Sequence, residues 1–347
     1  MNEKRIFILI MALSACSLFA GNVPRTAFPI LRGPYLGQEP PGMTPELFAP
    51  GIVSTALNTR DIAISPDDRE IYFCVNAGGY TFATILVTRL RDGAWGAPEV
   101  LEHMEDPRWI NGEPCLSADG SRLFFYSNRP DPARNEEKGD DDIWVMERRG
   151  DSWGEPRNLG EPVSSAAPEF FPSLTRDGTL YFTRREPSGV EHIFRSRLKD
   201  GRYQEAEKLP AQVNSGQTRF NAFVAPDEGW IIVPTFGRGD SQGATDYYIC
   251  FRSHDDTWSE AVNMGAVINS RGGNEYSASL SPDGRYLFFM SSRVPPREQW
   301  PAKLSAAWLQ RLAAEPGIDN TSIYWIDARV IETLRPQGAA VTRRQTP

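Results

Sequence analysis

Short apolar runs alternate with polar turns along most of this sequence, and one combination of the two recurs. It consists of a small residue, an Asp-Gly type of turn and then an apolar strand. Copies occupy residues 65–73, 117–125, 175–182, 225–233 and 281–289. Because Asp-Gly favours the positive-φ turn of a tight hairpin, each copy predicts two antiparallel strands.

A second phrase, ending in an aromatic residue, follows each of the first four copies. The aromatic residues are Trp95, Trp153, Tyr203 and Trp258, and 24 or 25 residues separate each from the next turn aspartate. A third apolar run lies inside each repeat, for example at 85–87 and 143–145. Four strands per unit, repeated every 50 to 58 residues, are typical of a propeller blade. The pattern therefore predicts an all-β chain folded as a β-propeller.

The two ends of the repeat region complement each other. Residues 48–54 resemble the outer segment of a blade whose inner strands lie at the C-terminal end. We therefore expect five four-stranded blades over residues 43–335, in a ring closed by strands from both termini, which leaves no exposed sheet edge. A ring with a degenerate sixth blade is the alternative. A long insertion at 294–320 contains a helix candidate, residues 303–314, that we expect to pack on its blade through Trp308.

Two stretches resemble a known family of propellers. They are residues 281–289 (SPDGRYLFF) and residues 127–129 (SNR), the latter followed by 142–144 (DIW). Both are similar to the WD-like repeats of TolB-type periplasmic propellers, and the resemblance covers residues 43–335. It implies the propeller fold. For function it implies periplasmic binding or scaffolding in some members, while others stand beside enzymes.

The N-terminus has the form of an export signal. Lys4 and Arg5 precede an apolar run, residues 6–15, that is too short to span a bilayer. The run ends in Leu-Ser-Ala before Cys16, as in bacterial lipoprotein signals. We expect residues 1–15 to be a signal peptide, Cys16 to be lipidated, and 16–42 to be a tether and lead-in. An ordinary cleaved signal, with Cys16 incidental, is the alternative.

The export signal and the lipidated Cys16 predict a protein of the cell envelope, in the periplasm, that contacts a membrane only through its N-terminal lipid. Ser17 after the cysteine resembles sorting to the outer membrane. Residues 336–347 are expected to be a disordered tail. We expect the chain to be a monomer.

Composition narrows the classes of partner. The net charge of -8 at pH 7 argues against a nucleic-acid partner, because binding a phosphate backbone needs clustered Lys and Arg. Short basic groups such as residues 184–185 and 343–344 do not amount to a patch. Cys74, Cys115 and Cys250 each lie inside a strand-like run, which favours buried, unpaired cysteines. Their spacing matches no zinc site, and no cofactor motif is present.

Alignment of the five copies predicts a candidate site. Six positions before each turn aspartate stand Asp61, Glu113, Phe171, Asn221 and Ser277, and eight positions before it stand Thr59, Asn111, Glu169, Arg219 and Glu275. Period-two spacing places both sets on one side of their strands. Because innermost strands line a propeller's channel, both sets should meet at one mouth. The candidate ligand-binding residues are Asp61, Asn111, Glu113, Glu169, Arg219, Asn221 and Glu275, with Trp300 on the insertion as a stacking residue.

Two functions are compatible with this mouth. The first is a binding or scaffolding propeller that engages an envelope protein or glycan there. The second is a carbohydrate-active hydrolase or lyase that uses Asp61, Glu113, Glu169 or Glu275, which needs a carboxylate pair at a defined separation. Carboxylates held by neighbouring Arg and Asn side chains would favour the binder. A solvated mouth that binds nothing is a third possibility.

Overall fold

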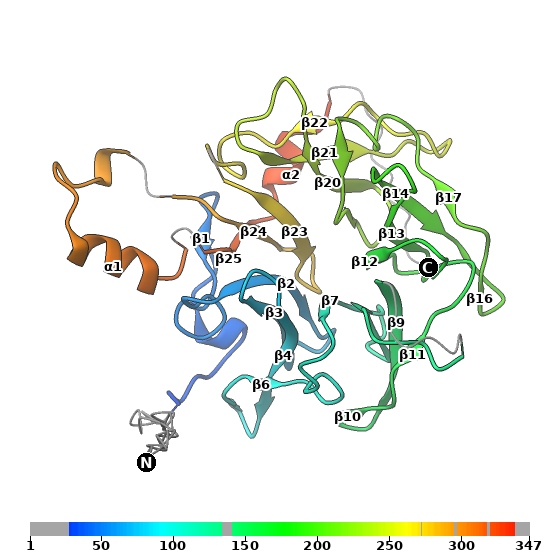
Figure 1. Cartoon of the computed structure of the whole chain (residues 1–347), viewed down its shortest axis with the longest axis horizontal. Coiled ribbons are helices and arrows are strands. Elements are labelled where there is room, and N and C mark those ends of the chain that lie inside the picture. The colour runs from blue at the N-terminus through cyan, green and yellow to red at the C-terminus, as the bar shows by residue number, and fades with distance from the viewer. Residues whose placement is uncertain (1–27, 134–140, 272, 295–296, 318–319, 337–347) are drawn as a thin grey trace, which may run out of the picture.

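The computed structural model describes residues 28–133, 141–271, 273–294, 297–317 and 320–336. Five antiparallel sheets surround a common centre (Figure 1). At that centre the inner strands contact one another in turn, β2 with β7, β7 with β12, β12 with β19, β19 with β23, and β23 with β2. This closed circuit confirms an all-β propeller of five blades.

Each blade runs outward from an inner strand. Blade 1 contains β2 (Asn58–Ile64), β3 (Glu70–Ala77), β4 (Phe82–Arg91), β5 (Ala94–Trp95) and β6 (Glu99–Val100). Blade 2 contains β7 (Asn111–Leu116), β8 (Arg122–Ser127), β9 (Asp142–Arg149), β10 (Ser152–Trp153) and β11 (Arg157–Asn158). Blade 3 contains β12 (Glu169–Leu174), β13 (Leu180–Arg185), β14 (Glu191–Ser196) and β17 (Glu207–Lys208), with a small hairpin of β15 (Leu198–Lys199) and β16 (Arg202–Tyr203).

The last two blades follow the same plan. Blade 4 contains β18 (Thr218–Arg219), β19 (Phe223–Val224), β20 (Trp230–Phe236), β21 (Thr245–Phe251) and β22 (Val262–Asn263). Blade 5 contains β23 (Glu275–Leu280), β24 (Tyr286–Ser291), β25 (Ser322–Asp327) and β1 (Glu46–Leu47). Short helices are η1 (Tyr35–Gly37), η2 (Arg297–Gln299), α1 (Ala306–Ala314) and α2 (Val330–Thr333).

The N-terminal strand β1 closes the ring by completing blade 5. Glu46 pairs with Trp325 and Leu47 with Tyr324. The next residue, Phe48, donates its backbone N–H to the Ile323 carbonyl at 2.8 Å and is fully buried. The predicted closure by strands from both termini is therefore confirmed.

Part of the segment assigned to the tether and lead-in packs on the folded body. Leu31 forms a bridge with Trp95, whose indole Nε1 donates to the Gly33 carbonyl at 2.8 Å. The buried ring of Tyr35 lies 5.4 Å from that of Tyr286 and 5.3 Å from that of Trp325. Residues 31–35 thus cover the seam between blades 5 and 1.

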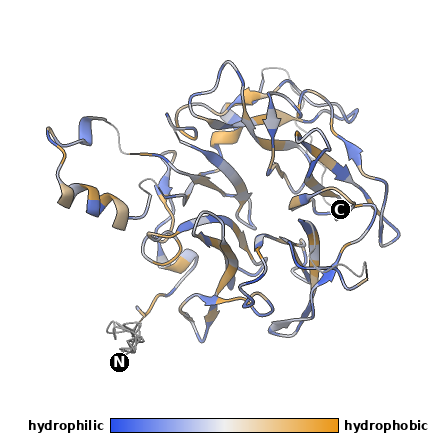
Figure 2. Ribbon diagram, viewed as in Figure 1, coloured by the Kyte–Doolittle hydropathy of each residue, from blue (hydrophilic) through white to orange (hydrophobic). Residues whose placement is uncertain are grey.

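The hydrophobic core lies between neighbouring blades. Each of the five seams holds its own cluster of buried apolar side chains, drawn from the two facing sheets. In Figure 2 the apolar stretches lie within the blades, whereas the outer loops are largely hydrophilic. Cys74 and Cys250 are buried in this core, Cys115 is partly buried, and all three are unpaired, as predicted.

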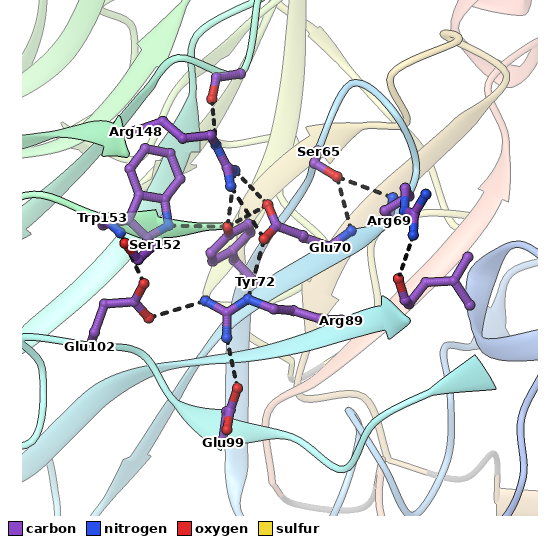
Figure 3. Close-up of polar contacts among 12 residues, drawn as sticks. Ser65, Arg69, Glu70, Tyr72, Arg89, Glu99, Glu102, Arg148, Ser152 and Trp153 are labelled. Carbon is purple, nitrogen blue, oxygen red and sulfur yellow. Dashed lines mark hydrogen bonds and ion pairs between the residues drawn. The ribbon is translucent and has the colours of Figure 1, made fainter. Parts of the chain in front are cut away.

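Charged side chains link neighbouring blades across two of the seams. Between blades 1 and 2, Glu70 accepts hydrogen bonds from Arg148 of the next blade and from Arg89 and Tyr72 of its own (Figure 3). Arg148 also lies 4.2 Å above the Trp153 ring. The seam between blades 3 and 4 contains a comparable network around Arg195, Arg252, Glu228 and Asp256.

One hairpin turn offers a test of backbone strain. Asp68 adopts a φ of 57° where three other blades have glycine. The left-handed region is costly for a residue with a Cβ, so Asp68→Gly is expected to raise the free energy of unfolding by about 0.5 kcal/mol, net of the extra chain entropy of glycine. Urea unfolding measures this change.

Glu228, at the same position of blade 4 with the same φ, provides the control. It accepts hydrogen bonds from Tyr181 and Arg252, so Glu228→Gly should destabilise the protein by about 1 kcal/mol or more. Equal effects of the two substitutions would show that backbone strain does not decide the outcome.

The insertion departs from expectation. Helix α1 has no buried residue, and Leu309 is 50% exposed. Figure 1 shows this helix projecting away from the blades. The predicted packing through Trp308 is therefore wrong: helix propensity and the Ser305 cap, which accepts from the Trp308 N–H, form the helix without a core contact. None of the helices in the described ranges is long and apolar enough to cross a membrane.

Candidate functional site

Every inner strand carries the same irregularity at the same place. One extra residue bulges from the ladder of β2, β7, β12 and β23, and the inner strand of blade 4 is interrupted there between β18 and β19. All five bulge residues have a left-handed φ of 49–67°, and none is glycine. They are the predicted set six positions before the turn, Asp61, Glu113, Phe171, Asn221 and Ser277. Strain repeated five times around one channel is typical of a functional centre.

The bulge changes which side chains face the channel mouth. An extra residue interrupts the period of two, so a residue beyond the bulge faces the opposite way from its expected side. The mouth is therefore lined by the position seven before the turn, which holds Arg60, Phe170, Phe220 and Tyr276. The expectation that the set eight before the turn shares this mouth is wrong for that reason.

The bulge residues meet in a buried polar cluster around Arg60, which we call the central network. Arg60 Nη2 donates to Glu113 Oε1 at 2.7 Å and to Ser277 Oγ at 3.3 Å. Asn221 Nδ2 reaches the same two oxygens at 3.2 and 3.1 Å. Glu113 Oε2 accepts the backbone N–H of Phe171 at 2.7 Å, and Arg60 Nε lies 2.6 Å from Asp61 Oδ2. Side chains from blades 1, 2, 4 and 5 and the backbone N–H of Phe171 in blade 3 thus join across the channel.

Burial dominates the electrostatics of this network. It raises the pKa of Glu113 to about 8, because loss of water penalises the carboxylate more than Arg60 favours it. Burial also raises the pKa of Asp61 against the opposing charge of Arg60. Burial alone would lower the pKa of Arg60, but Asp61 and the other neighbouring groups hold it above its ordinary value. The network therefore favours a charged Arg60 and a protonated Glu113 near neutral pH.

Above the central network the channel opens into a cavity of about 350 Å³, the upper pocket. Its floor includes Glu113 and Asn221, and its aromatic wall is made of Tyr80, Tyr126, Phe170, Phe220 and Tyr276. The Arg60 guanidinium lies 4.7 Å from the centre of the Tyr276 ring, and the Phe220 ring lies 6.0 Å from the same ring.

Blade 2 contributes to the wall differently. It has Gly112 at the position where the other blades have large side chains. A Cβ there would lie 2.9 Å from Tyr126 Cε1, so the glycine leaves room for the tyrosine ring. The pocket therefore presents aromatic surface from most of its circumference.

Four predicted ligand residues lie away from the pocket and bind the protein itself. Asn111 Oδ1 accepts from Arg129 Nη2 at 2.6 Å, and Arg219 Nη2 donates to the Asn214 carbonyl at 2.9 Å. These two side chains hold loops at the rim of their blades. Their predicted role in ligand binding is not supported by this placement.

The two glutamates of this set are similarly engaged. Glu169 Oε1 accepts from Arg184 Nε at 2.6 Å, and Glu275 Oε1 accepts from Ser270 and Ser291 at 2.5 and 2.9 Å. Burial raises the pKa of Glu275 to about 7. Ser165 Oγ also donates to Glu169 Oε1 at 2.5 Å. Through Ser165 and Ser270, each carboxylate fastens the loop before its own inner strand.

The remaining predicted residues lie elsewhere. Trp300 is 46% exposed on the insertion and does not line the upper pocket. Cys16, the signal peptide and most of the tail lie outside the described residues. In the described part of the chain no three His, Cys, Asp or Glu side chains are grouped so as to hold a metal ion.

Sequence reasoning missed Arg60 and the aromatic wall. The same alignment held the signal at the position seven before the turn aspartate, where four of the five residues are large and either cationic or aromatic. Tyr80 and Tyr126 do not stand at positions where the repeats share an aromatic residue. Only the folded chain brings them to the mouth.

Comparison of the sequence with family models and with curated proteins yields no match. Among solved structures, TolB from Acinetobacter baumannii is 15% identical with a TM-score of 0.43, over 68% of this chain and 51% of that one. A puromycin-hydrolyzing peptidase from Mycobacterium tuberculosis is 13% identical with a TM-score of 0.41, over 70% and 36%. The NanB sialidase of Streptococcus pneumoniae is 12% identical with a TM-score of 0.38, over 74% and 36%.

This chain thus spans about half the length of the TolB protein it matches. Similarities this distant assign no function. The propeller fold rests on the strand pairing described above.

Proposed function

We propose that this chain is a cell-envelope binding propeller that holds a glycan in the upper pocket. The observation that carries the proposal is the combination of half-buried aromatic rings with polar groups at the floor of one concave site of about 350 Å³. A sugar ring has apolar faces and a polar rim, so it can stack on rings such as Phe220 while its hydroxyls reach Asn221. The predicted export signal and Cys16 support an envelope address.

The state of the carboxylates favours binding over catalysis. Both oxygens of Glu113 already accept hydrogen bonds, from Arg60, Asn221 and the Phe171 N–H. Glu169 is held by Arg184, and Glu275 by two serines. A hydrolase needs one free acid and one free base or nucleophile on either side of a bond. Of the carboxylates that line the upper pocket, Glu113 is held in the central network and Glu191 pairs with Arg185 at 2.7 Å.

A thermal-unfolding screen of the purified protein against envelope and plant oligosaccharides tests the proposal. At 100 times its dissociation constant, a true ligand adds about 2.7 kcal/mol to the free energy of unfolding. Phe220→Ala should weaken binding of that sugar at least about 10-fold, which is about 1.4 kcal/mol.

Phe82→Ala is the matched control, because Phe82 is an exposed phenylalanine outside the upper pocket. Its removal should leave the affinity unchanged. A sugar that binds Phe220→Ala as tightly as the parent would contradict a glycan site in this pocket. Binding of a protein partner at the same face would then be the remaining hypothesis.

A further inference from the structure

Helix α1 and the segment before it leave large apolar side chains uncovered. Leu304 and Leu309 are 67% and 50% exposed, and Trp300 is 46% exposed. No residue of α1 belongs to any of the five core clusters, and Figure 1 shows the helix standing away from the blades. Apolar side chains gathered on a projecting element in this way are typical of an interaction surface.

The helix has one apolar side. Trp308, Leu309 and Leu312 lie at positions i, i+1 and i+4, which fall within about 100° of each other around a helix. Gln310 lies on the opposite side, and Arg311 lies beside the apolar side. Trp308 and Leu312 are half-buried, whereas Leu309 is exposed. The helix is therefore amphipathic, and its apolar side contributes nothing to the core of the propeller.

Positive charge accompanies this apolar side, although the whole chain has a net charge of -8. Residues 303–314 contain Lys303 and Arg311 and no Asp or Glu. Both cations are exposed, and neither forms an ion pair with an acidic side chain in the described part of the chain. An apolar helix face with cations at its border and tryptophan on it matches the headgroup region of an anionic bilayer.

The N-terminal segment leaves the ring from the side that carries α1. Tyr35 packs on Tyr286 and Trp325, which belong to β24 and β25, the two strands that flank the insertion. Figure 1 shows the first described residues and α1 on the same side of the ring, toward the left of the view. Phe28 stands 12 residues after Cys16, the predicted site of lipidation. An extended chain of that length spans at most about 40 Å, so a lipid there would keep α1 near the membrane.

We propose that α1 lies on an anionic membrane surface, with Leu304, Trp308 and Leu309 among the lipid acyl chains and Lys303 and Arg311 at the headgroups. The sequence predicts membrane contact through the N-terminal lipid alone, and the helix adds a second contact. Two contacts on one side of the ring fix the orientation of the propeller relative to the bilayer. This membrane contact does not rest on the proposed glycan function.

A fluorescent dye at residue 309 tests the proposal. Leu309→Cys in the full chain is labelled with nitrobenzoxadiazole and mixed with vesicles of phosphatidylethanolamine and phosphatidylglycerol. The emission should rise at least about 2-fold and shift to the blue, because the dye leaves water for the acyl chains. The parent protein, treated with the same dye, gives the background from its own cysteines. No rise at residue 309 in excess vesicles would overturn the proposal.

Val267→Cys is the matched control, because Val267 is 46% exposed in blade 4, outside the insertion. A dye there should keep its emission, and an equal rise at both positions would refute insertion by α1. This comparison holds whatever the N-terminus contributes to vesicle binding, since each dye reports only its own surroundings.

Two further measurements identify what covers the helix. Leu304→Glu, added to the protein labelled at residue 309, should lower the rise at least about 2-fold, because a carboxylate enters the acyl region at high cost. Light scattering without vesicles measures self-association of the unlabelled protein. A dimer that separates in Leu309→Glu, together with a dye rise that needs no vesicles, would assign α1 to a second copy of the chain and overturn the membrane proposal.

Discussion

Replacement of Arg60 by methionine is expected to lower the free energy of unfolding by about 3–5 kcal/mol at pH 7, because removing one partner of a buried ion pair leaves its counter-charges uncompensated. Arg60 is the cation that faces both Asp61 and Glu113 in the central network, and its side chain is 8% exposed. Methionine preserves much of the length and apolar contact of the side chain, so the loss reports mainly on charge. Urea unfolding at equilibrium measures it.

Two controls separate charge from packing in the Arg60 experiment. Arg60→Lys retains the charge and should recover part of the loss. The deficit of Arg60→Met should also shrink at low pH, where both carboxyls can take up protons. A loss below about 1 kcal/mol at pH 7, or one that does not change with pH, would contradict a central network held together by this guanidinium.

Glu70→Gln should cost about 3 kcal/mol, the second large effect, because Glu70 joins blades 1 and 2 through two arginines in a largely buried seam (Figure 3). Burial alone would raise the pKa of Glu70, but hydrogen bonds from Arg148 and Tyr72 hold it below its ordinary value. The charged form is therefore favoured in the folded state. Its contribution is complete above the unfolded pKa, near 4.5, and is lost as the pH falls through the folded value.

The parent and Glu70→Gln should therefore converge in stability at acidic pH. Glu99→Gln is a matched control, because Glu99 contacts the same Arg89 at 2.7 Å but is 62% exposed. That substitution should cost less than about 0.5 kcal/mol. Equal losses for the two variants would show that the seam does not depend on the buried carboxylate.

The repeat architecture could be predicted from the sequence because each element has a local cause. Turn aspartates and glycines specify the hairpins, and the constant distance from each aromatic residue to the next turn fixes the blade length. The same spacing placed Phe48 in the closing blade. The turn phrase recurs five times and the aromatic spacing four times, so a degraded copy such as 225–233 could still be aligned with the others.

The site could be predicted only in part, because the five β-bulges of the inner strands leave no recognisable pattern in the sequence. Glycine marks most left-handed positions, yet the five bulges are formed by residues as different as Glu113, Phe171 and Ser277. Without the bulge, period two places Glu169 and Glu275 at the mouth, where they are not found. The same limit applies to α1, whose apolar residues suggested packing that the folded chain does not provide.

The aromatic wall above the central network is the proposed seat of the glycan. The most direct measurement is a crystal structure of the protein with the sugar that raises its unfolding temperature most. We expect a sugar ring stacked on Phe220 or Tyr276, with hydroxyls directed at Asn221 and Glu113. A sugar bound on the outer surface of a blade, with the upper pocket filled only by water, would contradict the account.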